Sequence, residues 1–119
     1  IGHELTALHG IDHARTLAIV LPGLWKTLKE EKKAKLVQYA ERVWGVKTGT
    51  EDEKADAAIE KTEKFFQSLG IGTRLSDYGV KKDTIDRIVK RFEERKWLAM
   101  GDRGLTTPVT TRKALECQL

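Results

Sequence analysis

Residues 12–28 are DHARTLAIVLPGLWKTL, and their apolar side chains recur at helical spacing. This spacing predicts a helix that begins at Asp12, whose carboxylate can cap free main-chain N–H groups. Ile19 and Trp25 make further faces of the helix apolar, so we expect it to be deeply buried. Pro22 removes one helical hydrogen bond and predicts a kink. The side chains expected on the main inner face are Leu17, Val20, Leu21, Leu24 and Leu28.

Helical spacing also dominates on both sides of this stretch, and strand-type alternation is weak. Thr50 with Glu53 forms a capping-box pattern, and Thr107 followed by Pro108 predicts the start of a short last helix. No internal linker divides the chain, so we expect one all-α helical bundle over residues 1–119. The other expected helices cover residues 3–9, 31–44, 50–69 and 83–97, with a loop at 72–82. Their expected inner faces are Leu36, Ala40 and Val43; Ala55, Ile59, Thr62, Phe66 and Leu69; and Ile85, Ile88, Val89 and Phe92.

Composition limits the function classes. The 119 residues include 22 Lys and Arg against 18 Asp and Glu, a net charge of +4, but the two signs are interleaved. Interleaving is typical of solvated helix faces and not of a nucleic-acid site, so we expect no nucleic-acid partner. The longest apolar run, Leu17 to Leu21, is too short to cross a bilayer, and we expect no membrane association. Cys117 is the only cysteine, which excludes an internal disulfide and fits a cytoplasmic location.

All three histidines lie within the first thirteen residues, as His3, His9 and His13. Taken by spacing alone, they are better explained as structural or surface residues than as a metal site, which needs three or four ligands. Gly10 and the expected cap Asp12 interrupt any continuous helix between His9 and His13. His13 falls in the first turn of its helix, where the helix dipole favours the neutral imidazole that binds metals.

Several stretches together carry a family resemblance: GHELTA at 2–7, HG at 9–10, DHA at 12–14 and TLAIVLP at 16–22. The similarity continues through AKL at 34–36, QYAERVW at 38–44, FF at 65–66 and LSDYG at 75–79, and it fades after about Lys96. In these stretches the chain resembles the iron-containing (group III) alcohol dehydrogenases. More narrowly, it is similar to their branch of butanol dehydrogenases and NADPH-dependent aldehyde reductases.

The resemblance implies a C-terminal helical domain of the dehydroquinate-synthase-like, iron-containing alcohol dehydrogenase fold. It implies a domain truncated on its N-terminal side and separated from its α/β cofactor-binding domain. In this family one Asp and three His hold the metal, and His13 falls on the last of these histidines. His3 falls on the histidine beside nicotinamide and substrate, which makes it the candidate catalytic and cofactor-binding residue. His9 matches no catalytic position and is expected to be structural. The remaining ligands would precede Ile1.

The implied reaction is hydride transfer between NADP(H) and an alcohol or aldehyde, with a divalent metal, Fe²⁺ or Zn²⁺, as Lewis acid. The resemblance implies that the isolated chain is inactive and binds neither cofactor tightly. Surfaces that pack on absent parts would favour a homodimer or other self-association. The alternative hypothesis is a stand-alone basic helical module for protein or nucleic-acid interaction. Its basis is the +4 charge and the expected helix 83–97 followed by a Gly-containing turn.

Overall fold

A computed structural model describes residues 1–119 apart from the side chain of Asp102. Extended pairing in the described residues is limited to one antiparallel bridge, between Met100 and Thr106, so the all-α prediction is confirmed. No helix in this described part has the length and apolarity needed to cross a membrane. The elements in order are α1 (Gly2–His9), α2 (His13–Thr27), α3 (Lys29–Arg42), α4 (Glu51–Ser68), η1 (Leu75–Tyr78), α5 (Lys82–Glu94), η2 (Asp102–Gly104) and α6 (Pro108–Glu116).

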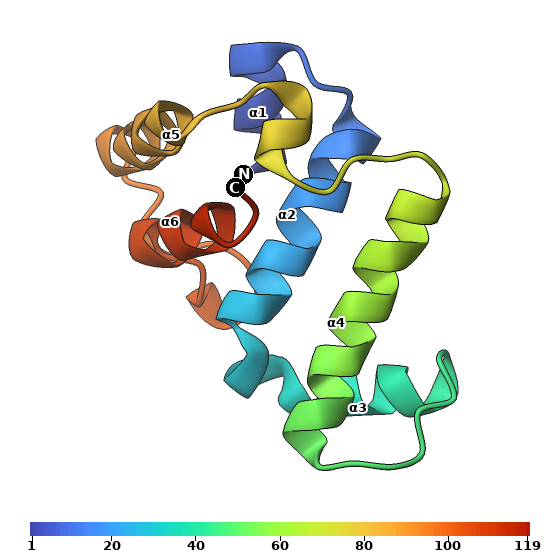
Figure 1. Cartoon of the computed structure of the whole chain (residues 1–119). Helices are drawn as coiled ribbons and strands as arrows, with labels where there is room; N and C mark the ends of the chain where they lie inside the picture. Colours follow the sequence, from blue (N-terminus) through green and yellow to red (C-terminus); the bar gives the residue numbers. More distant parts are fainter.

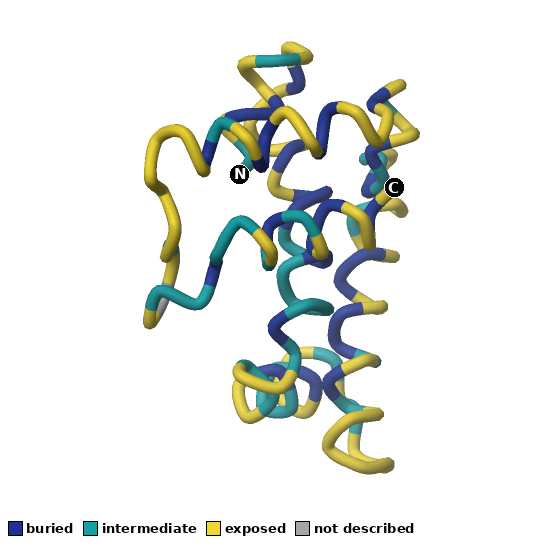
Figure 2. The backbone as a smooth tube through the Cα atoms, turned by 90° about the vertical axis from the view of Figure 1, so that its left-hand side faces the viewer, coloured by how far each residue is buried: buried dark blue, intermediate teal, exposed yellow. Residues whose placement is uncertain are grey.

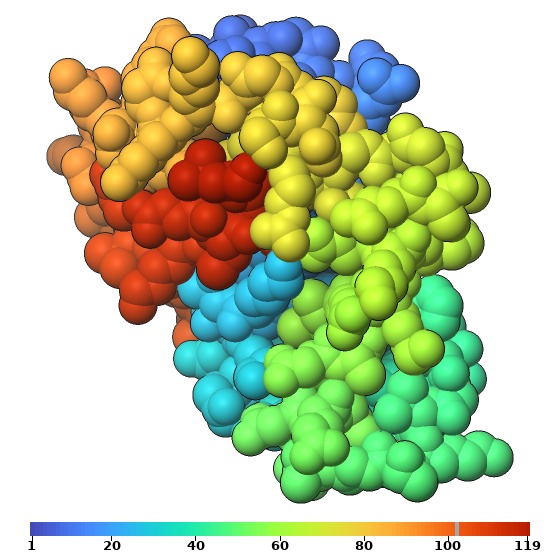
Figure 3. Space-filling view, in the orientation of Figure 1, coloured from blue at the N-terminus to red at the C-terminus, as the bar shows by residue number. Residues whose placement is uncertain are grey.

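The central element is α2, which contacts α1, α3, α4 and α6. Figure 1 shows α4 running alongside α2 on one side, with α5 and α6 on the other. In the space-filling view the later part of α2 is visible at the surface, below α6 and beside α4 (Figure 3). The deep burial expected for this helix is confirmed on the faces that these elements cover, where Ile19 and Val20 are buried, but its first turn is exposed.

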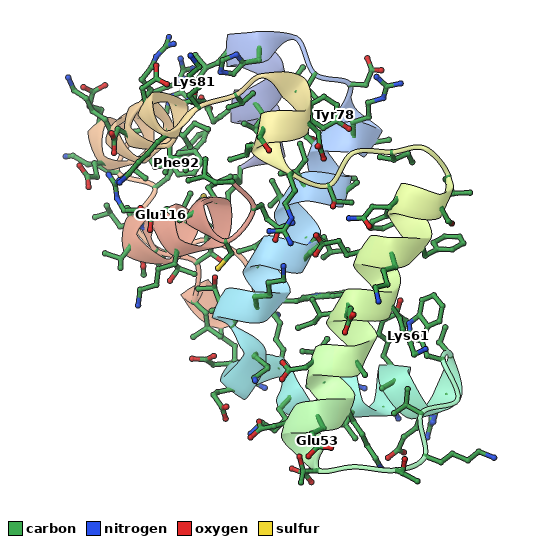
Figure 4. The ribbon with its side chains drawn as sticks, viewed as in Figure 1. Glu53, Lys61, Tyr78, Lys81, Phe92 and Glu116 are labelled. Atoms are coloured by element: carbon green, nitrogen blue, oxygen red, sulfur yellow. The ribbon has the colours of Figure 1, made fainter. Side chains whose placement is uncertain are left out.

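Two apolar cores lie on the two sides of α2. The larger core joins α1, α2, η1, α5 and α6, and Phe92 projects from α5 into it (Figure 4). All four residues predicted for the inner face of α5 are buried. The smaller core joins α3 and α4 through Leu36, Ala55 and Ile59, with Trp25 of α2 packed against it.

At Gly23 the backbone of α2 approaches α6 so closely that no side chain fits. A Cβ atom built on Gly23 would lie 2.3 Å from the carbonyl oxygen of Ala114. Helix α2 continues through Pro22 and this contact as far as Thr27. The glycine therefore fixes how deeply α6 seats on α2, because contact distance in helix packing is set by the side chains at the crossing.

Both predicted N-caps with hydroxyl side chains are confirmed. The amide of Glu53, in the first turn of α4 (Figure 4), donates to Thr50 Oγ1 over 3.2 Å. The amide of Thr110 donates to Thr107 Oγ1 over 3.2 Å, and Pro108 is the first residue of α6. Both helices therefore begin where local hydrogen bonding satisfies their first free amides.

Three leucine and valine side chains expected to be buried are exposed: Leu17 by 48%, Val43 by 63% and Leu69 by 60%. For Val43 and Leu69 the reason is the helix boundary. Helix α3 ends at Arg42 and α4 ends at Ser68, so both side chains follow the last helical residue. Leu17 lies within α2, on a face that no described element covers. The inner-face prediction was wrong at these three positions.

Buried polar contacts connect distant segments. The Glu63 carboxylate of α4, 6% exposed, lies 3.1 Å from Lys26 Nζ and accepts a 3.1 Å hydrogen bond from Thr73 Oγ1. Lys26 also donates to Gln118 Oε1 over 2.8 Å, and Gln118 Nε2 donates to the Thr73 carbonyl over 2.8 Å. On the opposite side, buried Glu4 of α1 pairs with Arg91 and Arg95, at the end of α5. These contacts hold α1 to α5 and α2 to the chain end.

Exposed ion pairs join α3 to α4. Lys33 Nζ lies 2.8 Å from the Asp52 carboxylate, and Lys54 Nζ lies 2.8 Å from that of Glu41. The hydrogen bond from Lys33, followed by its charge, lowers the pKa of Asp52 below its ordinary value of 3.8. Because the carboxyl pKa is lower in the folded state than in the unfolded state, the ion pair stabilises the fold fully at pH values above the unfolded-state pKa. This stabilisation is lost as the pH falls through the folded-state pKa.

The Asp52→Asn variant is therefore expected to melt slightly below the wild type at pH 7 and together with it at pH 2. The difference in melting temperature between variant and wild type at pH 7 should be small, because the ion pair is exposed. It should become smaller in 1 M NaCl, because salt screens the pair. Thermal unfolding followed by circular dichroism at both pH values measures it. A gap of equal size at pH 7 and pH 2 would contradict the assignment of the effect to this ion pair.

Candidate functional site

The connection between α1 and α2 is a short turn fixed by its own hydrogen bonds. Gly10 ends α1 in the left-handed region, with φ at 67°, and its amide donates to the Thr6 carbonyl over 2.8 Å. The Thr6 hydroxyl donates to the Ile11 carbonyl over 2.8 Å, and the Ile11 side chain is buried in the larger core. The hydrogen bonds within the turn and the burial of Ile11 thus fix the start of α2 relative to α1.

The N-terminal ends of the two helices meet at another close contact. A Cβ atom on Gly2 would lie 2.6 Å from Thr16 Oγ1. Thr16 is fully buried, and its hydroxyl donates to the His13 carbonyl over 2.6 Å. Because the residue at position 2 has no side chain, the first turn of α1 can lie directly on the first turn of α2.

This contact brings His3 and His13 together. Their rings stack with centroids 5.5 Å apart and planes inclined by 29°, and both side chains are exposed. His13 is the first residue of α2, as predicted from the sequence. Two histidines ten positions apart therefore form one surface pair. This placement is compatible with the metal-ligand role predicted for His13 and the catalytic and cofactor-binding role predicted for His3, and both roles stay predictions.

His9 points elsewhere. Its Nε2 lies 2.7 Å from Thr84 Oγ1, so this imidazole joins α1 to α5 and is used structurally, as the resemblance implied.

Asp12 occupies the N-cap position of α2, but the prediction that its carboxylate caps the helix was wrong. The side chain makes no capping hydrogen bond. It turns outward instead, is 78% exposed, and lies 3.9 Å from Arg15 Nε. In this conformation the charge of Arg15 competes with the helix amides for the carboxylate.

The described residues hold no cluster of three or more His, Cys, Asp or Glu side chains that could bind a metal ion by itself. The His13 imidazole nevertheless suits a single ligand position, because its ring is exposed and a neutral imidazole nitrogen is a common metal ligand. The donors present therefore fit part of a metal site, which needs further ligands to be complete.

Sequence reasoning found both histidines but missed the two residues that bring them together. Gly2 and Thr16 lie within the quoted family stretches, yet neither is a chemical group that suggests a site. Their role depends on a contact between two helices, and spacing along one helix does not report it.

Comparisons with known proteins concern the family and the fold of the chain. The family described as Fe-containing alcohol dehydrogenase family, C-terminal, matches residues 1–102. The NADPH-dependent aldehyde reductase YqhD of Escherichia coli strain K12 is 49% identical over 98% of this chain and 30% of its own length. NADH-dependent butanol dehydrogenase A of Clostridium acetobutylicum is 32% identical over 96% of this chain and 29% of its own length.

Solved structures show the same fold. A substrate- and cofactor-free form of the E. coli aldehyde reductase YqhD superposes with a TM-score of 0.94 at 48% identity, over 99% of this chain and 31% of that one. NADH-dependent butanol dehydrogenase A from Thermotoga maritima superposes with a TM-score of 0.87 at 24% identity, over 98% and 31% of the two chains, which supports the fold alone.

The chain thus spans about 30% of the length of the E. coli relative. These findings do not favour the alternative of a stand-alone interaction or nucleic-acid-binding module. The match over residues 1–102 and the two levels of sequence identity show that the chain belongs to the Fe-containing alcohol dehydrogenase family and corresponds to its C-terminal helical domain.

Proposed function

We propose that this chain is the metal-site part of an NAD(P)H-linked alcohol dehydrogenase or aldehyde reductase, which transfers a hydride between nicotinamide and an alcohol or aldehyde. The observation that carries the proposal is the exposed pair of His3 and His13, in a chain 49% identical to an aldehyde reductase. Because both imidazoles are exposed and their positions are fixed by the contact between α1 and α2, further metal ligands and a nicotinamide can complete a site around them.

In this proposal His13 is one ligand of a divalent metal, held by the first turn of α2. When bound, such a metal polarises the carbonyl or alcohol oxygen of the substrate as a Lewis acid. His3, beside His13, contacts the nicotinamide or the substrate and holds or passes a proton at an imidazole nitrogen. Gly2 and Thr16 act as positioning residues, since they set the distance between the two rings.

The finer assignments follow the relatives. NADPH is favoured over NADH because the relative with the higher identity is named as NADPH-dependent, at 49% against 32% for the NADH-dependent one. Iron is favoured over zinc by the family description alone. We further propose a cytoplasmic location, small alcohols or aldehydes as the binding partners, a homodimeric or otherwise self-associated state, and no nucleic-acid or membrane partner.

The isolated chain is expected to bind Zn²⁺ or Fe²⁺ weakly, with a dissociation constant above about 10 μM, because it supplies too few of the usual three or four ligands. Isothermal titration of the isolated chain, under anaerobic conditions for Fe²⁺, measures this affinity. Stoichiometric binding at nanomolar concentration would show a complete site within these residues and would contradict the assignment.

The proposal itself is tested by joining this chain to the part of E. coli YqhD that it does not cover. The joined protein is loaded with Fe²⁺ or Zn²⁺ and assayed for aldehyde-dependent oxidation of NADPH. Activity supports the proposal. A folded, metal-loaded joined protein that oxidises no NADPH with any of a panel of aldehydes would overturn it.

A further inference from the structure

A buried carboxylate, that of Glu4, directly follows His3 in the first turn of α1. Glu4 is only 5% exposed. One of its carboxylate oxygens lies 2.7 Å from Arg95 Nη1, and the other forms an ion pair with Arg91 Nε. Both arginines lie at the C-terminal end of α5, just before the mostly exposed segment that leads to α6 (Figure 2). The carboxylate is therefore held in one place, because moving it would leave a buried charge unpaired.

Helix α1 depends on its neighbours for its orientation. It has eight residues, and isolated helices shorter than about 12–15 residues are marginal in water. Leu5 and Leu8 join it to the larger core, but apolar packing is non-directional. Its directional contacts with α5 are the ion pairs of Glu4 in the first turn and the hydrogen bond between His9 and Thr84 at the last residue. Polar groups therefore fix both ends of α1 to α5.

Fixing Glu4 also fixes the rotation of α1 about its axis, and with it the direction of His3. Successive side chains of a helix are turned by about 100°, since a turn contains about 3.6 residues. When Glu4 faces α5, Leu5 faces the core and His3 is turned outward. There its ring stacks on that of His13, with centroids 5.5 Å apart. The close contact between the first turns of α1 and α2 sets how near the helices lie, whereas Glu4 sets the direction of the imidazole.

From these contacts we propose that Glu4 is a positioning residue for the histidine pair. Held by the two guanidinium groups of α5, its carboxylate keeps the His3 imidazole beside that of His13. Because this carboxylate is buried and paired, Glu4 acts through His3 and does not itself contact nicotinamide or substrate. The catalytic consequence rests on the proposed function, whereas the placement of the two rings can be measured without it.

Glu63 of α4 is a closely matched control. It is 6% exposed and also has two cationic partners, Lys26 and Arg74, each 3.1 Å from its carboxylate. These contacts lie away from α1 and α5. Glu4→Gln and Glu63→Gln should therefore both lower the melting temperature, and only Glu4→Gln should disturb the histidine pair.

The first measurement is the nuclear Overhauser effect between the ring protons of His3 and His13. It is made below the melting temperature on the isolated chain with isotope-labelled histidines and no metal, and His9→Ala identifies the signals of the third histidine. If the isolated chain does not melt cooperatively, the joined protein is labelled instead. Wild type and Glu63→Gln should show the effect, and Glu4→Gln should lose it. An effect that persists in Glu4→Gln, is lost in both variants or is absent from the wild type would overturn the inference.

The second measurement is kinetic and uses the metal-loaded joined protein. There the Ile1 amino group, whose charge also acts on Glu4 in the isolated chain, is part of a peptide bond. Glu4→Gln should lower kcat about tenfold or more at unchanged KM and metal content, since a misplacement of about 1 Å can cost about a hundredfold. Glu63→Gln should leave kcat unchanged. In an Arg91→Gln, Arg95→Gln background Glu4→Gln should cause no further loss, because residues of one ion-pair network are not additive.

The two measurements separate this inference from the proposed function. An inactive joined protein with the wild-type sequence counts against the proposed function alone, and the ring contact then still decides whether Glu4 places His3. An active joined protein whose Glu4→Gln variant keeps the wild-type kcat overturns the inference. So does an equal loss of kcat in Glu63→Gln, because a general loss of packing would then explain both variants.

Discussion

The Gly23→Ala variant is expected to lose about 3 kcal/mol or more of unfolding free energy. The new methyl group would lie 2.3 Å from the Ala114 carbonyl oxygen and 3.0 Å from Gln118 Cγ, so α6 has to move away from α2. A glycine-to-alanine change inside a helix otherwise gains about 1 kcal/mol from helix propensity, and a net loss therefore isolates the steric effect. Urea unfolding followed by circular dichroism and tryptophan fluorescence measures it.

Gly79→Ala is the matched control. Gly79 has φ at 70° but open space around a built Cβ atom, so alanine meets conformational strain without a clash. Its expected cost is about 1–2 kcal/mol, the penalty of one left-handed residue. If Gly23→Ala proved as stable as the wild type, the close packing of α2 on α6 would be wrong.

The His13→Ala variant of the joined protein is expected to lose its metal and at least about a hundredfold in kcat/KM, since even outer-shell changes cost 10–100-fold. His3→Ala should keep the metal and lower kcat. Metal per chain, measured by mass spectrometry, separates the two roles in a way that a general loss of stability would not.

His9→Ala serves as the control for this pair. It removes the contact with Thr84 and should lower the melting temperature while leaving metal content unchanged. A His13→Ala protein that retains full metal occupancy would contradict the ligand assignment, whatever its activity.

The helical fold could be predicted from the sequence because its signals are local. Apolar spacing in residues 12–28 located α2, and the hydroxyls of Thr50 and Thr107 marked the starts of α4 and α6. The family stretches identified His3 and His13 as candidates. Each of these inferences uses residues that lie within a few turns of one another.

The exposure of apolar side chains and the buried polar contacts could not be predicted, because they depend on contacts between residues that are distant in the sequence. Periodicity shows which face of a helix is apolar but not whether anything covers it, and Leu17 is exposed for this reason. Trp97 follows α5 and contacts Phe92, yet it remains 47% exposed beneath the Arg95 guanidinium, which the sequence does not indicate. Glu4 and Glu63 both lie in expected helices, and nothing in the sequence indicates that both are buried in polar contacts.

Those same polar contacts have a consequence for the order of folding. The hydrogen bond between Lys26 and Gln118 spans 92 positions, and that between Arg95 and Glu4 spans 91. Closing such long loops is entropically slow, whereas α3 and α4 adjoin in sequence and can pair early. We expect the α3–α4 hairpin to form first, and the enclosure of α2 by α1, α5 and α6 to limit the refolding rate. A nascent chain would therefore leave α2, the most apolar helix described here, exposed until α6 has been made.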